Sequence, residues 1–115
     1  AARDIWRTIQ ALPGYHILVA VEGGEVLSSC TLLIVPNLTH GGRPYGVVEN
    51  VVTHLSHRGK GFATACLDYA RKLAEKQRCY KLMLMTGSKQ ESTLRFYREA
   101  GYRDDQKTAF VQWLP

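Results

Sequence analysis

Runs of apolar residues divide this chain into segments of two kinds. Short runs rich in β-branched residues predict strands. The expected strands cover residues 15–21, 25–35, 47–53, 80–86 and 107–114, with a short partner for the last one at 102–103. Segments with an apolar residue at every third or fourth position predict helices. The expected helices cover residues 3–12, 89–100, and a stretch from the glycines at 59 and 61 to residue 74.

The order of these elements predicts the architecture. Residues 22–24 carry two glycines, which are typical of a tight hairpin turn between the first two strands. Hairpins come first in the chain, and helical crossovers come later. This order favours a mixed α/β fold, in which helices flank a central mixed β-sheet. At 115 residues, we expect one domain covering residues 1–115.

Local signals mark the ends of the later elements. Ser88 followed by Glu91 matches a capping box, which predicts Ser88 as the N-cap of the last helix. Gly101 is expected to end that helix. The segment 36–46 contains three glycines and two prolines, which is typical of a surface loop.

Composition is that of an ordinary globular domain. The chain is 45% hydrophobic, and no apolar run approaches the length that spans a bilayer. Its cysteines, Cys30, Cys66 and Cys79, are odd in number and lack C-x-x-C spacing, which argues against a disulfide framework or a zinc site. The histidines show no ligand spacing either, so we expect no metal. With no signal-peptide pattern at the start, these features favour a cytoplasmic setting and no membrane partner.

The net charge of +5 is compatible with nucleic acid, a membrane surface or an anionic cofactor as partner. The basic residues are scattered, apart from small groups at 58–60 and 71–72. No aromatic platform motif accompanies them, so the pattern does not favour nucleic acid. An anionic cofactor needs only a local basic patch, and the group at 58–60 is one.

That basic group lies in the stretch that organises the chain. A buried strand over 47–53 is followed by Arg58-Gly59-Lys60-Gly61 and then by a helix. The first turn of a helix leaves N–H groups without partners and is electropositive. Glycines let a bulky anion approach the backbone, so the stretch suits a phosphate or pyrophosphate. The alternative is a surface turn whose basic residues are merely solvated.

Residues 58–63 also match the pattern Q/R-x-x-G-x-G/A. At this point the chain resembles the GNAT superfamily of acetyl-coenzyme A-dependent N-acetyltransferases. The resemblance follows the element order over about residues 3–114, with specific motifs in 47–64 and 94–102. It implies a GNAT fold that lacks the family's usual first strand and helix. It also implies acetyl-CoA as cosubstrate and an amine, on a small molecule or a protein, as acceptor.

The resemblance implies two groups of cofactor-binding residues. The strand residues Val51, Val52 and Thr53 are expected to run alongside the pantetheine arm and offer backbone groups to it. The expected pyrophosphate site consists of Arg58, Gly59, Lys60, Gly61, Phe62, Ala63 and Thr64. For the valines, simple core packing explains the sequence equally well.

Glu49 is the candidate general base. It stands within the apolar run V-V-E-N-V-V, and burial makes a carboxylate a better proton acceptor. Strand alternation predicts that Glu49 shares a face with Val51 and Thr53. Asn50, on the other face, is a candidate for ordering substrate or water. The alternative for Glu49 is a position at the start of the strand that points to solvent.

Tyr97 is the candidate general acid. Residues 94–102 are similar to the family's terminal helix, commonly F-Y-x-x-x-G-F, although Tyr102 replaces its last phenylalanine. The resemblance implies that Tyr97 protonates the departing CoA thiolate. An amphipathic tyrosine that packs against the core is the alternative.

Two rival functions remain open at this stage. One is a non-catalytic acyl-CoA-binding or regulatory module on the same fold, and the other is a small basic nucleic-acid-binding domain. If the first strand is missing, the strand over 15–21 becomes a sheet edge. We therefore expect self-association, an exchanged segment or instability of the chain, with a homodimer as one form of self-association.

Overall fold

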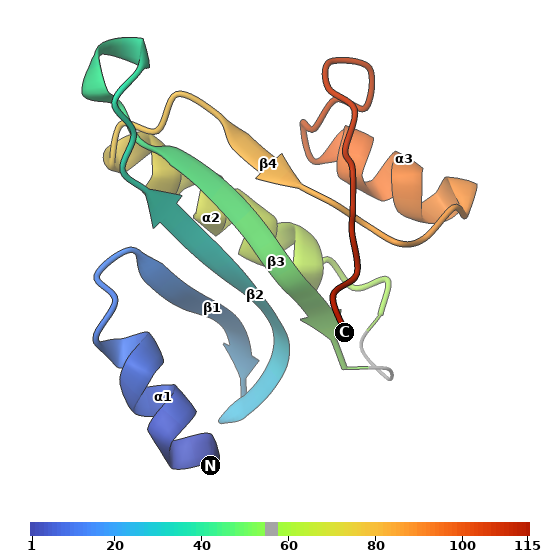
Figure 1. The fold of residues 1–115 in the computed structure, drawn as a ribbon. Coiled ribbons are helices and arrows are strands. Elements are labelled where there is room, and N and C mark those ends of the chain that lie inside the picture. The colour runs from blue at the N-terminus through green and yellow to red at the C-terminus, as the bar shows by residue number, and fades with distance from the viewer. Residues whose placement is uncertain (55–57) are drawn as a thin grey trace. The chain divides into compact units, whose positions relative to one another are not determined.

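The computed structural model describes residues 1–54 and 58–115 (Figure 1). They form two compact parts, Ala1–Leu84 and Met85–Pro115. Within the described ranges, no helix is long and apolar enough to cross a membrane.

The first part holds a four-stranded sheet. Its elements are α1 (Ala2–Gln10), β1 (Tyr15–Glu22), β2 (Glu25–Val35), the 3₁₀ turn η1 (His40–Gly42), β3 (Tyr45–Thr53), α2 (Phe62–Lys76) and β4 (Leu82–Leu84). The strand order is β1-β2-β3-β4. Strands β1 to β3 pair antiparallel, whereas β4 pairs parallel to β3. The predicted mixed α/β fold with a central mixed sheet is confirmed.

Helix α2 packs against β1, β2 and β3 and lies behind the sheet in Figure 1. Its buried residues recur at helical spacing and meet buried strand residues, as the apolar pattern predicts. The buried apolar residues are Leu27, Cys30, Leu32, Val48, Cys66, Leu67, Ala70 and Ala74. The core of this part therefore lies between α2 and one face of the sheet.

Cys30 is part of that core rather than of a reactive site. Its Sγ donates to the Cys66 carbonyl oxygen at 3.8 Å, which joins β2 to α2. Burial, reinforced by the neighbouring Cys66 thiol, raises the pKa of Cys30 to about 11. A thiol held in its protonated form is a poor nucleophile, so Cys30 contributes packing.

Strand β1 is the edge of the sheet, as expected from the sequence, with β2 as its one partner among the described strands. The Ile34 N–H donates to the Gly14 carbonyl at 2.8 Å. By strand alternation, the backbone groups of Ile17 and Val19 then point away from β2. The side chains of these two residues are 43% and 50% exposed. Because Trp6 on α1 is also half exposed, this end of the part carries exposed apolar surface.

The second part contains helix α3 (Glu91–Glu99). The predicted strands over 107–114 and 102–103 are wrong, because neither segment has backbone pairing in the structure. Phe110 and Trp113 are each 91% exposed. A strand is stable only beside a partner, and Met85–Pro115 contains none.

The predicted cap of α3 is also wrong. The N-cap is Gln90, whose side chain makes no capping hydrogen bond. Ser88 Oγ instead accepts the Gln90 N–H at 3.2 Å and so closes the turn before the helix. Glu91 pairs with Arg98 rather than with the Ser88 backbone. Gly101, at φ 103°, follows the helix and ends it as expected.

Candidate functional site: the end of β3 and the start of α2

The ladder between β2 and β3 is interrupted near the end of β3. Glu49 pairs with Thr31, and Val52 pairs with Ser29. Two residues of β3, Asn50 and Val51, therefore stand opposite the single residue Cys30, which is a β-bulge. Asn50 has φ 52°, a left-handed conformation that asparagine tolerates better than most residues. The bulge makes β3 irregular where the resemblance placed the cofactor arm.

The bulge changes which side chains share a face. Thr31 and Ser29 lie two positions apart on β2 and so on one face, which means that Glu49 shares its face with Val52. The predicted grouping of Glu49 with Thr53 is wrong, because the extra residue reverses the alternation. Thr53 lies on the opposite face, where its hydroxyl is 3.0 Å from the Ser28 hydroxyl.

On the side of β3 where β4 lies, pairing stops at Val48. Among the described residues of Ala1–Leu84, no strand pairs with the rest of β3 on that side. The parallel pairing with β4 covers Gly46, Val47 and Val48 alone. The His54 N–H donates to the Leu27 carbonyl at 2.8 Å, so its backbone points toward β2. Strand alternation then turns the N–H and C=O groups of Thr53 away from β2. Thr53 thus presents a donor and an acceptor on the open side of the sheet.

The start of α2 has the geometry of an anion site. Its N-cap is Gly61, which has no side chain to cap the helix, and no acidic residue lies in the first turn. Ala65 makes the helix's first backbone bond, to the Gly61 carbonyl at 3.0 Å. The N–H groups of Ala63 and Thr64 therefore have no acceptor within the helix. These donors and the helix dipole favour a negatively charged group at this end.

The two glycines of the turn are required by backbone conformation. Gly59 has φ 80° and Gly61 has φ 83°, both in the left-handed region that costs other residues energy. A Cβ atom at either position meets nothing within 4 Å, so the space beside them is open.

Charge at the turn comes from Arg58 and Lys60, which are both exposed. Farther along α2, Arg71 pairs with Asp68 at 2.8 Å and Lys72 with the same carboxylate at 3.1 Å. Hydrogen bonds from Arg71 and then Lys72 lower the pKa of Asp68. The second basic group of the sequence is thus neutralised locally.

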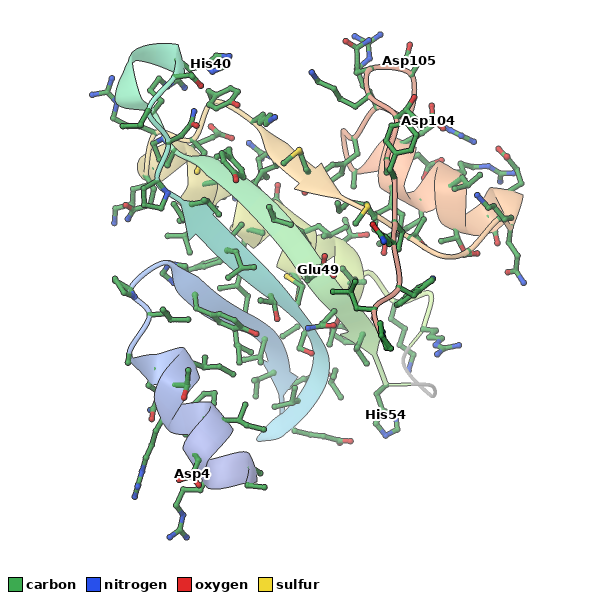
Figure 2. All side chains as sticks on the ribbon, viewed as in Figure 1. Asp4, His40, Glu49, His54, Asp104 and Asp105 are labelled. Carbon is green, nitrogen blue, oxygen red and sulfur yellow. The ribbon has the colours of Figure 1, made fainter. Side chains whose placement is uncertain are left out.

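The candidate base lies on the surface of the first part. Glu49 is exposed, so the burial that the sequence analysis expected is wrong (Figure 2). The reason is strand alternation: the preceding residue, Val48, is buried in the core, so Glu49 lies on the opposite face of the sheet. Asn50, at the bulge itself, is exposed as well.

The candidate acid lies in the second part. Tyr97 is half-buried on α3, and its ring meets that of Phe96 edge to face, with centroids 5.1 Å apart. Its carbonyl accepts the Tyr102 N–H at 3.1 Å. Arg98 bonds to Asp104 at 2.8 Å and also to Glu91, which ties the helix to the chain that follows it.

Residues 55–57, which connect β3 to the glycine turn, lie outside the described residues. Among the described residues, the cofactor candidates of the sequence form two groups, one at the end of β3 and one at the start of α2. The structure also shows a residue that the sequence analysis missed. Ser28 carries a buried hydroxyl that donates a hydrogen bond to the end of β3. No motif marks that serine, because L-S-S-C-T is an ordinary strand sequence.

Comparison with known proteins decides the family. The profile of the acetyltransferase (GNAT) family matches residues 2–102. This chain belongs to the GNAT family. GNAT acetyltransferases use acetyl-CoA as co-substrate. The GNAT assignment made from residues 47–64 and 94–102 is confirmed.

Relatives of this GNAT chain agree with that assignment. A putative acetyltransferase from Agrobacterium tumefaciens strain C58 has a TM-score of 0.91 and 37% identity, over 97% of this chain and 78% of that one. Glucosamine 6-phosphate N-acetyltransferase from Trypanosoma brucei brucei is 35% identical over 80 residues, or 70% of this chain. The chain spans about half the length of that curated relative, 52%. Glucosamine-6-phosphate N-acetyltransferase from Arabidopsis thaliana shares the fold, with a TM-score of 0.86 and 17% identity over 98% of this chain and 76% of that one.

Proposed function

We propose that this chain transfers the acetyl group of acetyl-CoA directly to the amine of a small molecule. The observation that carries the proposal is the bulge of β3 at Asn50, followed along the chain by the uncapped start of α2. Together they offer backbone donors and acceptors to an extended arm and N–H groups to a pyrophosphate.

Acetyl-CoA suits both groups of residues. Its pantetheine arm carries two amides, which pair with strand backbone as another strand does. The backbone of Thr53 on the open side of β3 is the pairing group. The pyrophosphate then lies over residues 59–64, where Ala63 and Thr64 donate N–H groups and Arg58 and Lys60 add charge.

The reaction needs three proton transfers. Glu49, directly or through water, first takes a proton from the ammonium group of the acceptor. The resulting neutral amine attacks the thioester carbonyl carbon, a C–N bond forms, the C–S bond breaks, and the nitrogen loses its extra proton to water. Tyr97 gives its hydroxyl proton to the departing thiolate. Because Glu49 is exposed, relay through water is the route that its position supports.

An amino sugar phosphate is the first acceptor to test. The motivation is the relative from Trypanosoma brucei brucei, whose name gives glucosamine 6-phosphate as its substrate. Such an acceptor combines a primary amine with a phosphate, and a chain of net charge +5 attracts phosphate. A protein amine is the alternative acceptor.

The test is acetyl-CoA-dependent thiol release with glucosamine 6-phosphate, other small amines and a peptide with a free amine. Glucose 6-phosphate, which lacks the amine, is the matched control. The proposal predicts thiol release with an amine and none with the control. Binding of acetyl-CoA with no turnover on any amine would identify a non-catalytic acyl-CoA-binding module. The absence of acetyl-CoA binding would contradict the proposal altogether.

A further inference from the structure

Ser28 is a buried hydroxyl whose bonds end on the bulged strand. It lies on β2, and its relative exposure is 2%. Its Oγ donates to the Val52 carbonyl oxygen at 2.9 Å. The hydroxyl has one proton to give, so the Thr53 hydroxyl, 3.0 Å away, donates to Ser28 in turn. One side chain thus bonds to two successive residues of β3.

Those bonds reinforce a short stretch of the β2–β3 ladder. After the bulge, the β2–β3 ladder has two register pairs, Ser29 with Val52 and Ser28 with Thr53. The His54 N–H bond to Leu27 follows them. A slip of one residue in so short a ladder would turn the backbone of Thr53 toward β2 and close the open side.

We propose that Ser28 is a positioning residue for the acyl-CoA arm. Its hydroxyl holds β3 in the register that keeps the Thr53 N–H and C=O groups on the open side of the sheet. This inference rests on the proposed function, because it assigns to Thr53 the pairing with pantetheine amides. Ser28 itself is buried beneath the strand and acts only through Val52 and Thr53.

The bonds predict a selective effect on binding. Removal of the buried hydroxyl takes one hydrogen bond from the Val52 carbonyl and one from the Thr53 hydroxyl. In Ser28→Ala the affinity for CoA should fall by about 5- to 30-fold, a factor typical of the loss of a buried, hydrogen-bonded hydroxyl. ADP has a pyrophosphate but no pantetheine arm. Its affinity should stay within about twofold, because the start of α2 keeps its conformation.

The experiment is calorimetric titration of the whole chain with CoA and, separately, with ADP. Ser29→Ala is the matched control, since Ser29 is the next residue of β2 and its side chain lies on the other face. Its side chain makes no hydrogen bond to β3 in the described residues. Both affinities of Ser29→Ala should equal those of the original chain.

The outcomes separate the two proposals. Loss of CoA affinity with ADP affinity retained supports the role of Ser28. Equal loss for both ligands, or no loss for either, overturns it while leaving the proposed function intact. If the unaltered chain binds no CoA, the proposed function fails and this inference fails with it. If Ser28→Ala does not fold, Ser28→Cys retains the shape with a weaker donor, and the same selective loss is expected of it.

Discussion

The two parts of the described chain differ in what fixes their geometry. Every buried residue lies in Ala1–Leu84, where a sheet and α2 hold one another in place. Met85–Pro115 has one helix of nine residues and no fully buried residue. The groups proposed to bind the cofactor belong to the first part, and the proposed acid belongs to the second. The difference indicates that cofactor binding and protonation of the thiolate can be altered separately.

The largest expected effect comes from the second part. Tyr97→Phe removes the proposed acid but keeps the ring that packs on Phe96. Turnover should fall by about 10²- to 10⁴-fold, the usual contribution of general acid catalysis, while acetyl-CoA affinity stays constant. Steady-state kinetics and equilibrium titration measure the two quantities. Tyr69→Phe, on the exposed side of α2, is the matched control and should change neither. Turnover within a small factor of the original would mean that the thiolate takes its proton from water.

The next effect tests whether the first part supplies chemistry as well as binding. Glu49→Gln replaces the proposed proton acceptor, a carboxylate, with an amide of nearly the same size. Turnover should fall by about 10²-fold, at the low end of general base catalysis, because Glu49 is exposed. Steady-state kinetics with acetyl-CoA and a small amine measure the change. A variant that keeps its rate would mean that water alone takes the proton.

A smaller effect is expected from the charges of the glycine turn. Arg58→Ala with Lys60→Ala should weaken acetyl-CoA binding by about 10- to 100-fold, equivalent to about 1.4 to 2.8 kcal/mol. The loss should be greater at low salt, because added ions screen exposed charges. The control, Arg71→Ala with Lys72→Ala, removes the same charge where carboxylates already neutralise it. Titration of both double variants at two salt concentrations tests the difference, and equal affinities would remove the turn from the cofactor site.

The smallest effect concerns the sheet edge. The outward backbone of Ile17 and Val19 predicts self-association through β1, which Val19→Lys should reduce by placing a charge on the edge. The free energy of unfolding should change by no more than about 0.5 kcal/mol, since Val19 is half exposed. Sedimentation equilibrium measures the association, with Tyr69→Lys as the control for added charge. A stable monomer of the original chain at high concentration, with β1 amides protected from exchange, would contradict this prediction.

The sequence predicted the elements whose partners are close in the chain. Strands β1 and β2 follow one another through a glycine turn, and α2 buries the residues that its spacing indicated. The segment 107–114 has similar strand propensity but no partner, which a local pattern does not reveal. Ser88 failed as a cap because the same hydroxyl bonds equally well within the preceding turn.

The candidate site also shows what a local sequence pattern can and cannot predict. The glycine turn was predictable because positive φ angles require glycine at 59 and 61. The bulge was not predictable, because V-V-E-N-V-V fits a regular strand. Asn50 is the single residue of that run that favours a left-handed conformation, which is too weak a signal to indicate a bulge. That one inserted residue moved Thr53 to the face opposite Glu49. Ser28 was missed because only the register shows that its hydroxyl meets Val52.

The central claim is that acetyl-CoA binds along the end of β3 and the start of α2. The most direct measurement is a titration of the ¹⁵N-labelled chain with acetyl-CoA, followed by the backbone amide signals. The account predicts that the largest shifts appear at residues 51–53 and 59–64, with little change in β1. Saturable binding whose largest shifts lie elsewhere in the chain, with those two segments unmoved, would contradict it.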